Sequence, residues 1–156
     1  INSCCIDNRT RNFQFKILHR ITTTQTFLHK IGISDIDACF FCNEEPETLE
    51  HLFYDCRQTA KMITLVQSWL EKYTNQEVNI SKPALLLGDP TQCVLINHIY
   101  IILKQYIFTC KNKETNMNFT AFLKNIKEIY KLEMYLYGHS NYKHQKKWSS
   151  LQKALE

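Results

Sequence analysis

The chain has 156 residues, of which 44% are hydrophobic and 22% charged, and its formal net charge is +4. This composition is that of an average globular protein, which excludes wholesale disorder, and the length suits one domain over residues 1–156 that buries its own core. Only three glycines and three prolines are present. Because tight turns need these residues, their scarcity predicts an all-α fold. The segment that starts at Ile1 lacks the apolar stretch of a signal peptide, and we expect the chain to be cut from a longer one.

The first expected helix covers residues 9–33, in which apolar residues repeat at helical spacing and Lys16 and Arg20 share a second face one turn apart. Three consecutive threonines at 22–24 predict a break, because β-branched residues favour helices poorly. Gly32 is expected to end the second piece. A turn then leads into a cysteine-rich segment.

Three more helices are expected further along the chain. Residues 57–73 carry one apolar face and are followed by a polar stretch, 74–83, that is predicted to be a linker. Residues 94–110 are apolar almost all round, which predicts the central buried helix. A membrane span is the alternative, but this stretch is shorter than the ~20 residues that a span needs and contains polar side chains. Residues 118–137 are amphipathic, and the tail, 139–156, is basic.

The segment 39–56, CFFCNEEPETLEHLFYDC, places three cysteines and one histidine at the spacing C-x2-C-x8-H-x4-C. Thiolates and imidazoles are the ligands of structural zinc, and two residues between Cys39 and Cys42 let both thiolates reach one ion from a tight turn. His51 and Cys56 are expected on or just after a short helix, so that the ion ties turn to helix. Four protein ligands leave no position for water. The predicted cofactor is therefore a structural Zn²⁺, in a zinc-knuckle-like hairpin inserted between helices.

The other cysteines do not extend this pattern. Seven cysteines is an odd number, which argues against the disulfide framework of a secreted protein. Cys93 and Cys110 are expected to be small buried hydrophobic residues, and Cys4 and Cys5 have no clear interpretation. His98, within the buried helix, is expected to be a hydrogen-bonded core residue.

Charge is unevenly distributed along the chain: residues 1–30 sum to +4, residues 31–57 to −6 and residues 111–156 to +5. The acidic residues around the metal ligands would repel phosphate. Phe40 and Phe41 are therefore expected to pack the hairpin onto the helices, the alternative being that they stack on bases. The basic ends are better placed to contact nucleic acid.

The candidate nucleic-acid-binding residues form two groups, one near each end. They are Arg9, Arg11, Lys16, His19 and Arg20 in the first, and Lys143, His144, Lys146, Lys147 and Trp148 in the second. The alternative is that both are ordinary solvated faces, since the isoelectric point near 8.6 lies below the value of about 9 that is typical of strongly nucleic-acid-binding domains.

Catalytic motifs are absent from the sequence. It contains no phosphate-binding G-x-x-x-x-G-K-[ST] loop, no G-x-G-x-x-G and no G-x-S-x-G. No acidic pair is set as two-metal nucleases and polymerases require. We therefore expect this chain itself not to be an enzyme.

The stretch 47–56, ETLEHLFYDC, with C-x2-C before it and an aromatic-basic helix before that, resembles the zinc-binding region that follows the reverse transcriptase in non-LTR (LINE-type) retrotransposon polyproteins. The later segments 95–111, 119–137 and 143–148 are similar to the tail of vertebrate-type elements. The matching positions in the first half are Phe15, Lys16, Leu18, Arg20, Leu28, Ile33, Cys39, Cys42, Glu47, Thr48, Glu50, His51, Leu52, Phe53 and Cys56.

The resemblance implies the C-terminal domain of a protein that works by target-primed reverse transcription in the nucleus, with a cytoplasmic ribonucleoprotein stage. It implies element RNA or target DNA and the upstream reverse transcriptase as partners, with no membrane and no small-molecule substrate. The Y-x-D-D motif of the polymerase is absent, so the parent polyprotein would be the RNA-directed DNA polymerase. We expect a non-catalytic RNA- or DNA-binding accessory domain. The alternative is a protein-interaction module that docks on the polymerase or on a host factor.

Overall fold

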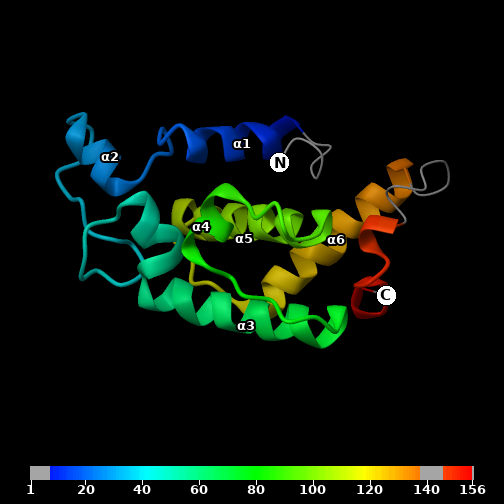
Figure 1. Ribbon diagram of the computed structural model, residues 1–156. Helices are drawn as coiled ribbons and strands as arrows, with labels where there is room; N and C mark the ends of the chain where they lie inside the picture. The colour runs from blue at the N-terminus through cyan, green and yellow to red at the C-terminus, as the bar shows by residue number, and fades with distance from the viewer. Residues whose placement is uncertain (1–7, 138–145, 156) are drawn as a thin grey trace.

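The computed structural model describes residues 8–137 and 146–155, which fold into helices arranged around one central helix (Figure 1). The described residues contain no β-strand, and only an isolated bridge pairs Ala38 with Pro46. The all-α prediction is confirmed. In chain order the named elements are α1 (Asn8–Leu18), α2 (Gln25–Lys30), the π-helical turn η1 (His51–Asp55), α3 (Arg57–Thr74), α4 (Lys82–Leu87), α5 (Val94–Asn112), α6 (Phe119–Tyr137) and α8 (Gln152–Leu155).

The predicted break after the first helix is present. The chain leaves α1 after Leu18 and begins α2 at Gln25, where the Thr24 side chain accepts a hydrogen bond from the Phe27 backbone N–H at 3.2 Å. A threonine that satisfies one of the free N–H groups of the first turn is a helix N-cap, so the threonine run starts α2 as well as ending α1. Gly32 follows α2 with φ +73°, a left-handed conformation that glycine adopts without steric cost.

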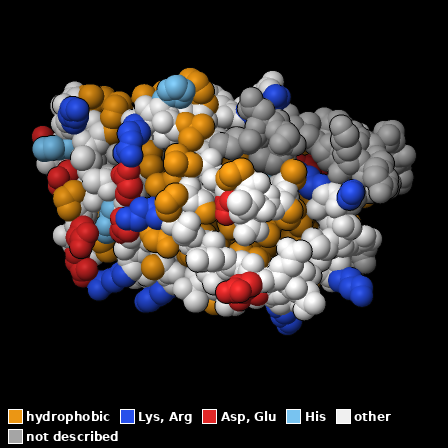
Figure 2. All heavy atoms as spheres, in the orientation of Figure 1, with side chains coloured by type: hydrophobic (Ala, Val, Ile, Leu, Met, Phe, Trp, Pro, Cys, Tyr) orange, Lys and Arg blue, Asp and Glu red, His pale blue; other side chains and the backbone are white. Residues whose placement is uncertain are grey.

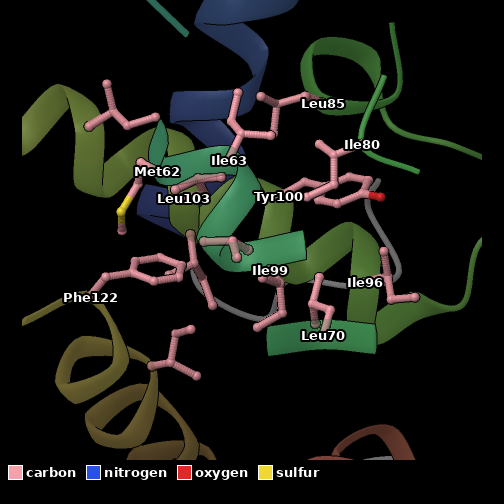
Figure 3. Packing of buried hydrophobic residues seen from close by; sticks show 14 of the residues in the cluster. Met62, Ile63, Leu70, Ile80, Leu85, Ile96, Ile99, Tyr100, Leu103 and Phe122 are labelled. Atoms are coloured by element: carbon pink, nitrogen blue, oxygen red, sulfur yellow. The ribbon is translucent and has the colours of Figure 1, made fainter. Parts of the chain in front are cut away.

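Helix α5 is the centre of the core, as predicted from its apolar sequence. It contacts α1, α4, α6 and η1, and Ile96, Ile99 and Leu103 are fully buried. Figure 3 shows these side chains packed against α3, the 78–86 segment and Phe122 of α6. Burying one such side chain contributes about 1.5–3 kcal/mol, so α5 fixes the positions of the helices around it. No helix among the described residues is long and apolar enough to cross a membrane.

Helix α3 packs on the core through the apolar face that the sequence indicates. Met62, Val66 and Leu70 recur every four residues and are buried, which places them on one side of the helix. The helix ends at Asn75, which adopts a left-handed conformation (φ 53°) and donates its backbone N–H to the Glu71 carbonyl at 3.0 Å. Asparagine tolerates this conformation better than most residues.

The predicted linker at 74–83 is wrong. Val78 and Ile80 insert into the core with 0% and 2% of their surface exposed, and α4 begins within the same stretch. Ser81 caps this helix by accepting a hydrogen bond from the Ala84 N–H at 3.3 Å, and Pro83 occupies its first turn. Residues 75–77 are exposed, and from Val78 to Ser81 polar side chains alternate with the two buried apolar ones, so the second half of the segment packs on the core.

The predictions for single residues have mixed outcomes. Cys110 is buried, but Cys93 is exposed at the N-cap of α5, so its predicted burial is wrong. Cys4 and Cys5 lie outside the described residues. His98 is buried as predicted, and its Nε2 lies 3.9 Å from a carboxylate oxygen of Glu133.

Candidate metal centre

The first two ligands stand on a short hairpin formed by residues 37–47. Its two sides are joined by hydrogen bonds from the Cys39 N–H to the Glu45 carbonyl at 2.8 Å and from the Glu47 N–H to the Asp37 carbonyl at 2.7 Å. Asn43 follows the second cysteine with φ 54° and donates its N–H to the Cys39 carbonyl. This left-handed residue reverses the chain, so that both thiols point to the same side.

The other two ligands are placed by η1 and the residue after it. The Cys56 N–H donates to the His51 carbonyl at 2.9 Å, a bond that spans five residues and widens the turn relative to an α-helix. The Thr48 hydroxyl accepts the His51 N–H at 3.0 Å and so caps the start of the turn. The wide turn brings His51 and Cys56 to the same point opposite the hairpin.

The four ligand atoms converge as a metal site requires. The thiol sulfurs of Cys39, Cys42 and Cys56 and a ring nitrogen of His51 all lie within 4.8 Å of one another. The sulfurs of Cys39 and Cys56 are 3.9 Å apart, and the Cys42 sulfur lies 3.3 Å from His51 Nε2. A tetrahedral zinc ion would set two sulfurs about 3.8 Å apart and a sulfur and a nitrogen about 3.6 Å apart. The sulfurs are also too distant for a disulfide. The predicted ligand set therefore fits a tetrahedral ion.

The environment of the thiols differs from one to the next. Burial raises the pKa of the Cys39 thiol to about 12. Burial also acts on Cys42, but hydrogen bonds from the backbone N–H groups of Glu44 and Glu45, together with those from the His51 and Cys39 side chains, outweigh it and lower the pKa of that thiol to about 7. A metal ion binds thiolates, and its charge offsets the desolvation that holds Cys39 protonated. The site is arranged for a cation.

Two acidic residues of the hairpin contact groups at the edge of the centre. Glu45 lies 3.3 Å from His51 Nδ1, the ring nitrogen that does not face Cys42. A carboxylate in this place fixes the orientation and tautomer of a metal-bound histidine. Glu44 pairs at 3.0 Å with Arg57, which is the first residue of α3. Glu44 and Glu45, two of the acidic residues between the ligands, therefore orient the metal-binding loop.

Glu47 connects the hairpin to the core and was not predicted as a site residue. Its carboxylate is fully buried and accepts hydrogen bonds from the backbone N–H groups of Gln25 at 2.9 Å and Phe40 at 3.2 Å. It also pairs with Lys111 of α5 at 2.7 Å, and the same ammonium donates to the Thr23 carbonyl at 2.6 Å. One ion pair therefore joins α5, the hairpin and the segment before α2. A match to a family pattern at Glu47 was the only sequence signal for it.

The centre has the properties of a closed structural site. Cys39 and Cys56 are fully buried, and Cys42 and His51 expose 7% and 6% of their surface. All four tetrahedral positions are filled by protein side chains, which leaves none for a catalytic water. Phe41 is half-buried and packs on the core, while Phe40 contacts it with ring centroids 5.2 Å apart. The expected packing role of Phe41 is confirmed.

The candidate nucleic-acid residues of the first group lie on and after α1, and all are exposed. His19 packs against Phe15 with ring centroids 4.1 Å apart and the ring planes tilted by 42°. Arg20 has left the helix and pairs with Glu50 at 2.6 Å, and this guanidinium lowers the pKa of the Glu50 carboxyl. Arg20 therefore does not share one continuous face with Lys16 as expected, because α1 ends between them.

The second group divides in the structure, and one member must be corrected. Trp148 exposes only 1% of its surface and donates its indole N–H to Glu133 at 2.6 Å, so its ring is not available to stack on a base. Lys147 pairs with the same carboxylate at 2.9 Å. Lys146 is exposed, while Lys143 and His144 lie outside the described residues. Two of the three described members thus attach the C-terminal segment to α6.

A helical domain with a closed Cys₃His metal centre is the class of protein that this fold and site define. Residues 2–62 match the family model described as zinc-binding in reverse transcriptase. The matched region includes all four ligands and ends within α3, and it supports zinc as the ion. No curated protein and no solved structure matches the chain.

Proposed function

We propose that this domain binds RNA or DNA as a non-catalytic accessory to a reverse transcriptase, with a structural Zn²⁺ bound by Cys39, Cys42, His51 and Cys56. The match of residues 2–62 to a family named for zinc binding in reverse transcriptase carries the proposal. In this interpretation the parent is a non-LTR element, its RNA and target DNA are the ligands, and the domain acts in the nucleus during target-primed reverse transcription.

The distribution of charge supports different roles for the zinc centre, which would be structural, and for α1, which would contact nucleic acid. Figure 2 shows most of the visible acidic side chains on the side of the molecule where α2 and the metal loop lie in Figure 1, with Lys and Arg side chains among them. These carboxylates pair with the cations beside them, as Glu44 does with Arg57 and Glu50 with Arg20, so this side offers little positive charge to a phosphate. Arg9, Arg11 and Lys16 are exposed on α1, a helix that contains no acidic residue. We infer that α1 contacts the phosphate backbone and that the zinc holds the loop that follows it.

A salt series tests this function. Binding of the zinc-loaded chain to a fluorescein-labelled single-stranded RNA is measured by anisotropy, and phosphate contacts predict a slope of about −0.7 in log K against log salt for each contact. Absence of binding to single-stranded RNA and to DNA at low salt would refute the proposal. Changing Lys16 to Glu should make the slope shallower.

A second candidate function is docking on the polymerase, and exposed apolar side chains favour it. Phe15, Leu18 and Ile21 follow one another along and after α1, and each exposes between 42% and 52% of its surface. Ile33 and Ile36 in the next loop expose 70% and 66%. Large apolar side chains left this exposed are typical of protein interfaces where they form a continuous patch. Binding to the upstream polymerase with little dependence on salt would support this function.

A further inference from the structure

A groove of about 940 Å³ lies between α1, α5 and α6 and is separate from the metal centre. Residues 105–113 of α5 and its C-cap form one wall, α1 forms the other, and Asn125 and Ile129 of α6 contribute to the lining. The segment 21–23 closes one part of it. Its volume lies within the range of about 300–1,000 Å³ that is typical of ligand sites.

The charged side chains among the residues that line the groove are all positive. Arg9, Lys16 and Lys113 all line it and are exposed, and no carboxylate is among its lining residues in the described chain. Arg9 and Lys16 are seven residues apart on α1, which separates them by about 10 Å along the helix. A groove whose described lining holds three cations and no carboxylate has a positive potential that attracts a polyanion.

Amides and aromatic rings occupy the space between these cations. Asn12, Asn112 and Asn125 line the groove, and their side chains make no hydrogen bond to the residues that the structure describes. A side-chain amide offers both a donor and an acceptor, as the edges of nucleobases do. Phe13 and Phe108 are half-buried in the lining, with ring centroids 5.6 Å apart. Base edges and base faces would each meet a matching group here.

We propose that this groove binds a single-stranded segment of nucleic acid, with phosphates along Arg9, Lys16 and Lys113 and one or more bases turned into the groove. The inference rests on the proposed function and locates it. The bases of a single strand can be unstacked and inserted between protein side chains, whereas those of a duplex are paired inside it. A recess lined by amides and aromatic rings below a cationic rim therefore suits a single strand better than a duplex.

Two matched pairs of variants test the location. Lys113→Glu reverses a groove cation, and Lys61→Glu makes the same change on the exposed surface of α3, which lies on the other side of α5 from α1 (Figure 1). Asn112→Asp adds a negative charge to the groove with almost no change of shape, and Asn79→Asp does so at an exposed position outside it. All four residues are exposed, so the fold should tolerate each change.

The probe is a fluorescein-labelled 20-nucleotide single-stranded RNA, measured with the full zinc-loaded chain. Three groove contacts predict a salt slope of about −2, and Lys113→Glu should reduce its magnitude by at least ~0.7. Lys61→Glu and Asn79→Asp should leave the salt slope unchanged. Their affinity should stay within about twofold of the wild type, a margin that allows for long-range charge effects. An RNA duplex of the same length should compete less well than the single strand.

The outcomes separate this inference from the proposed function. Selective weakening by Lys113→Glu and Asn112→Asp, with a preference for the single strand, supports the groove. If the wild type binds but the groove variants behave like their controls, the groove is overturned and the proposed function stands. Equal competition by the duplex overturns insertion of bases. If the wild type binds no nucleic acid, both ideas fail together.

Discussion

Replacing Lys111 by methionine removes the buried cation that faces Glu47 while keeping a side chain of similar length. Glu47 is fully buried and Lys111 exposes 7% of its surface, with 2.7 Å between ammonium and carboxylate. Breaking a buried ion pair costs about 3–5 kcal/mol, since the remaining charge has lost its partner. Two backbone N–H groups still bind the Glu47 carboxylate, so we expect a loss near the lower limit, about 3 kcal/mol.

The loss should appear in thermal unfolding of the zinc-loaded protein. For a chain of this size, 1 kcal/mol corresponds to a shift of about 2–4 °C in Tm, so Lys111→Met should lower the Tm by about 6–12 °C. Lys113→Met is the matched control, because Lys113 is exposed two residues further on and should change stability by no more than about 0.5 kcal/mol. Far-UV circular dichroism follows both.

A double-mutant cycle separates the ion pair from simple packing. Glu47→Gln, Lys111→Met and the double variant should give a coupling energy of at least ~1 kcal/mol, because the second change removes the charge that the first left unpaired. The reasoning is refuted if Lys111→Met costs less than ~1 kcal/mol, or if the two single changes add without coupling.

Three further outcomes are expected. Cys42→Ser should abolish stoichiometric zinc binding and melt the metal hairpin, seen as lost amide-exchange protection at residues 37–56; an unchanged Tm would contradict a structural ion. Arg20→Gln should raise the pKa of Glu50, whose ordinary value is 4.5 and which Arg20 lowers. Because the folded pKa is the depressed one, this partly exposed pair stabilises the fold above pH 4.5 and ceases to do so as the pH falls through the folded value. The two proteins should therefore differ by at most about 1 kcal/mol at pH 7 and converge in acid, as urea denaturation at each pH will show. Trp148→Phe removes the indole N–H that donates to Glu133 and should lower the free energy of unfolding in urea by about 1–3 kcal/mol. An unchanged urea midpoint would show that this hydrogen bond does not stabilise the fold.

Local patterns in the sequence were enough to predict the metal ligands and the main helices. The four ligands occur within 18 residues, and their chemistry is the same whatever the rest of the chain does. Helix α5 was recognisable because a stretch that is apolar on all sides can only be buried. The break before α2 followed from the threonine run, whose last member caps the next helix. In each case the cause and its effect lie within one or two helical turns.

Most of the missed contacts join distant parts of the chain, whereas helix α4 was missed in spite of local signals. Lys111 pairs with Glu47, and Trp148 with Glu133, and neither partner is indicated by its own neighbours in sequence. A tryptophan among lysines is typical of a nucleic-acid contact, and only the fold shows that Trp148 is buried with its indole N–H bonded to Glu133. Helix α4 was missed although Ser81 and Pro83 stand as a cap and a first-turn proline should, because the polar residues before them suggested a linker.

The metal centre and the groove meet at Lys111, although neither contains it. Its ammonium binds Glu47 of the metal hairpin and the carbonyl of Thr23, and Thr23 lines the groove. A zinc ion bound by the four ligands would fix the hairpin that carries Glu47, and the Glu47 carboxylate holds Lys111 beside the edge of the groove. If the groove binds nucleic acid as we propose, the acidic loop would support that binding through the position of the groove wall, without itself contacting the ligand.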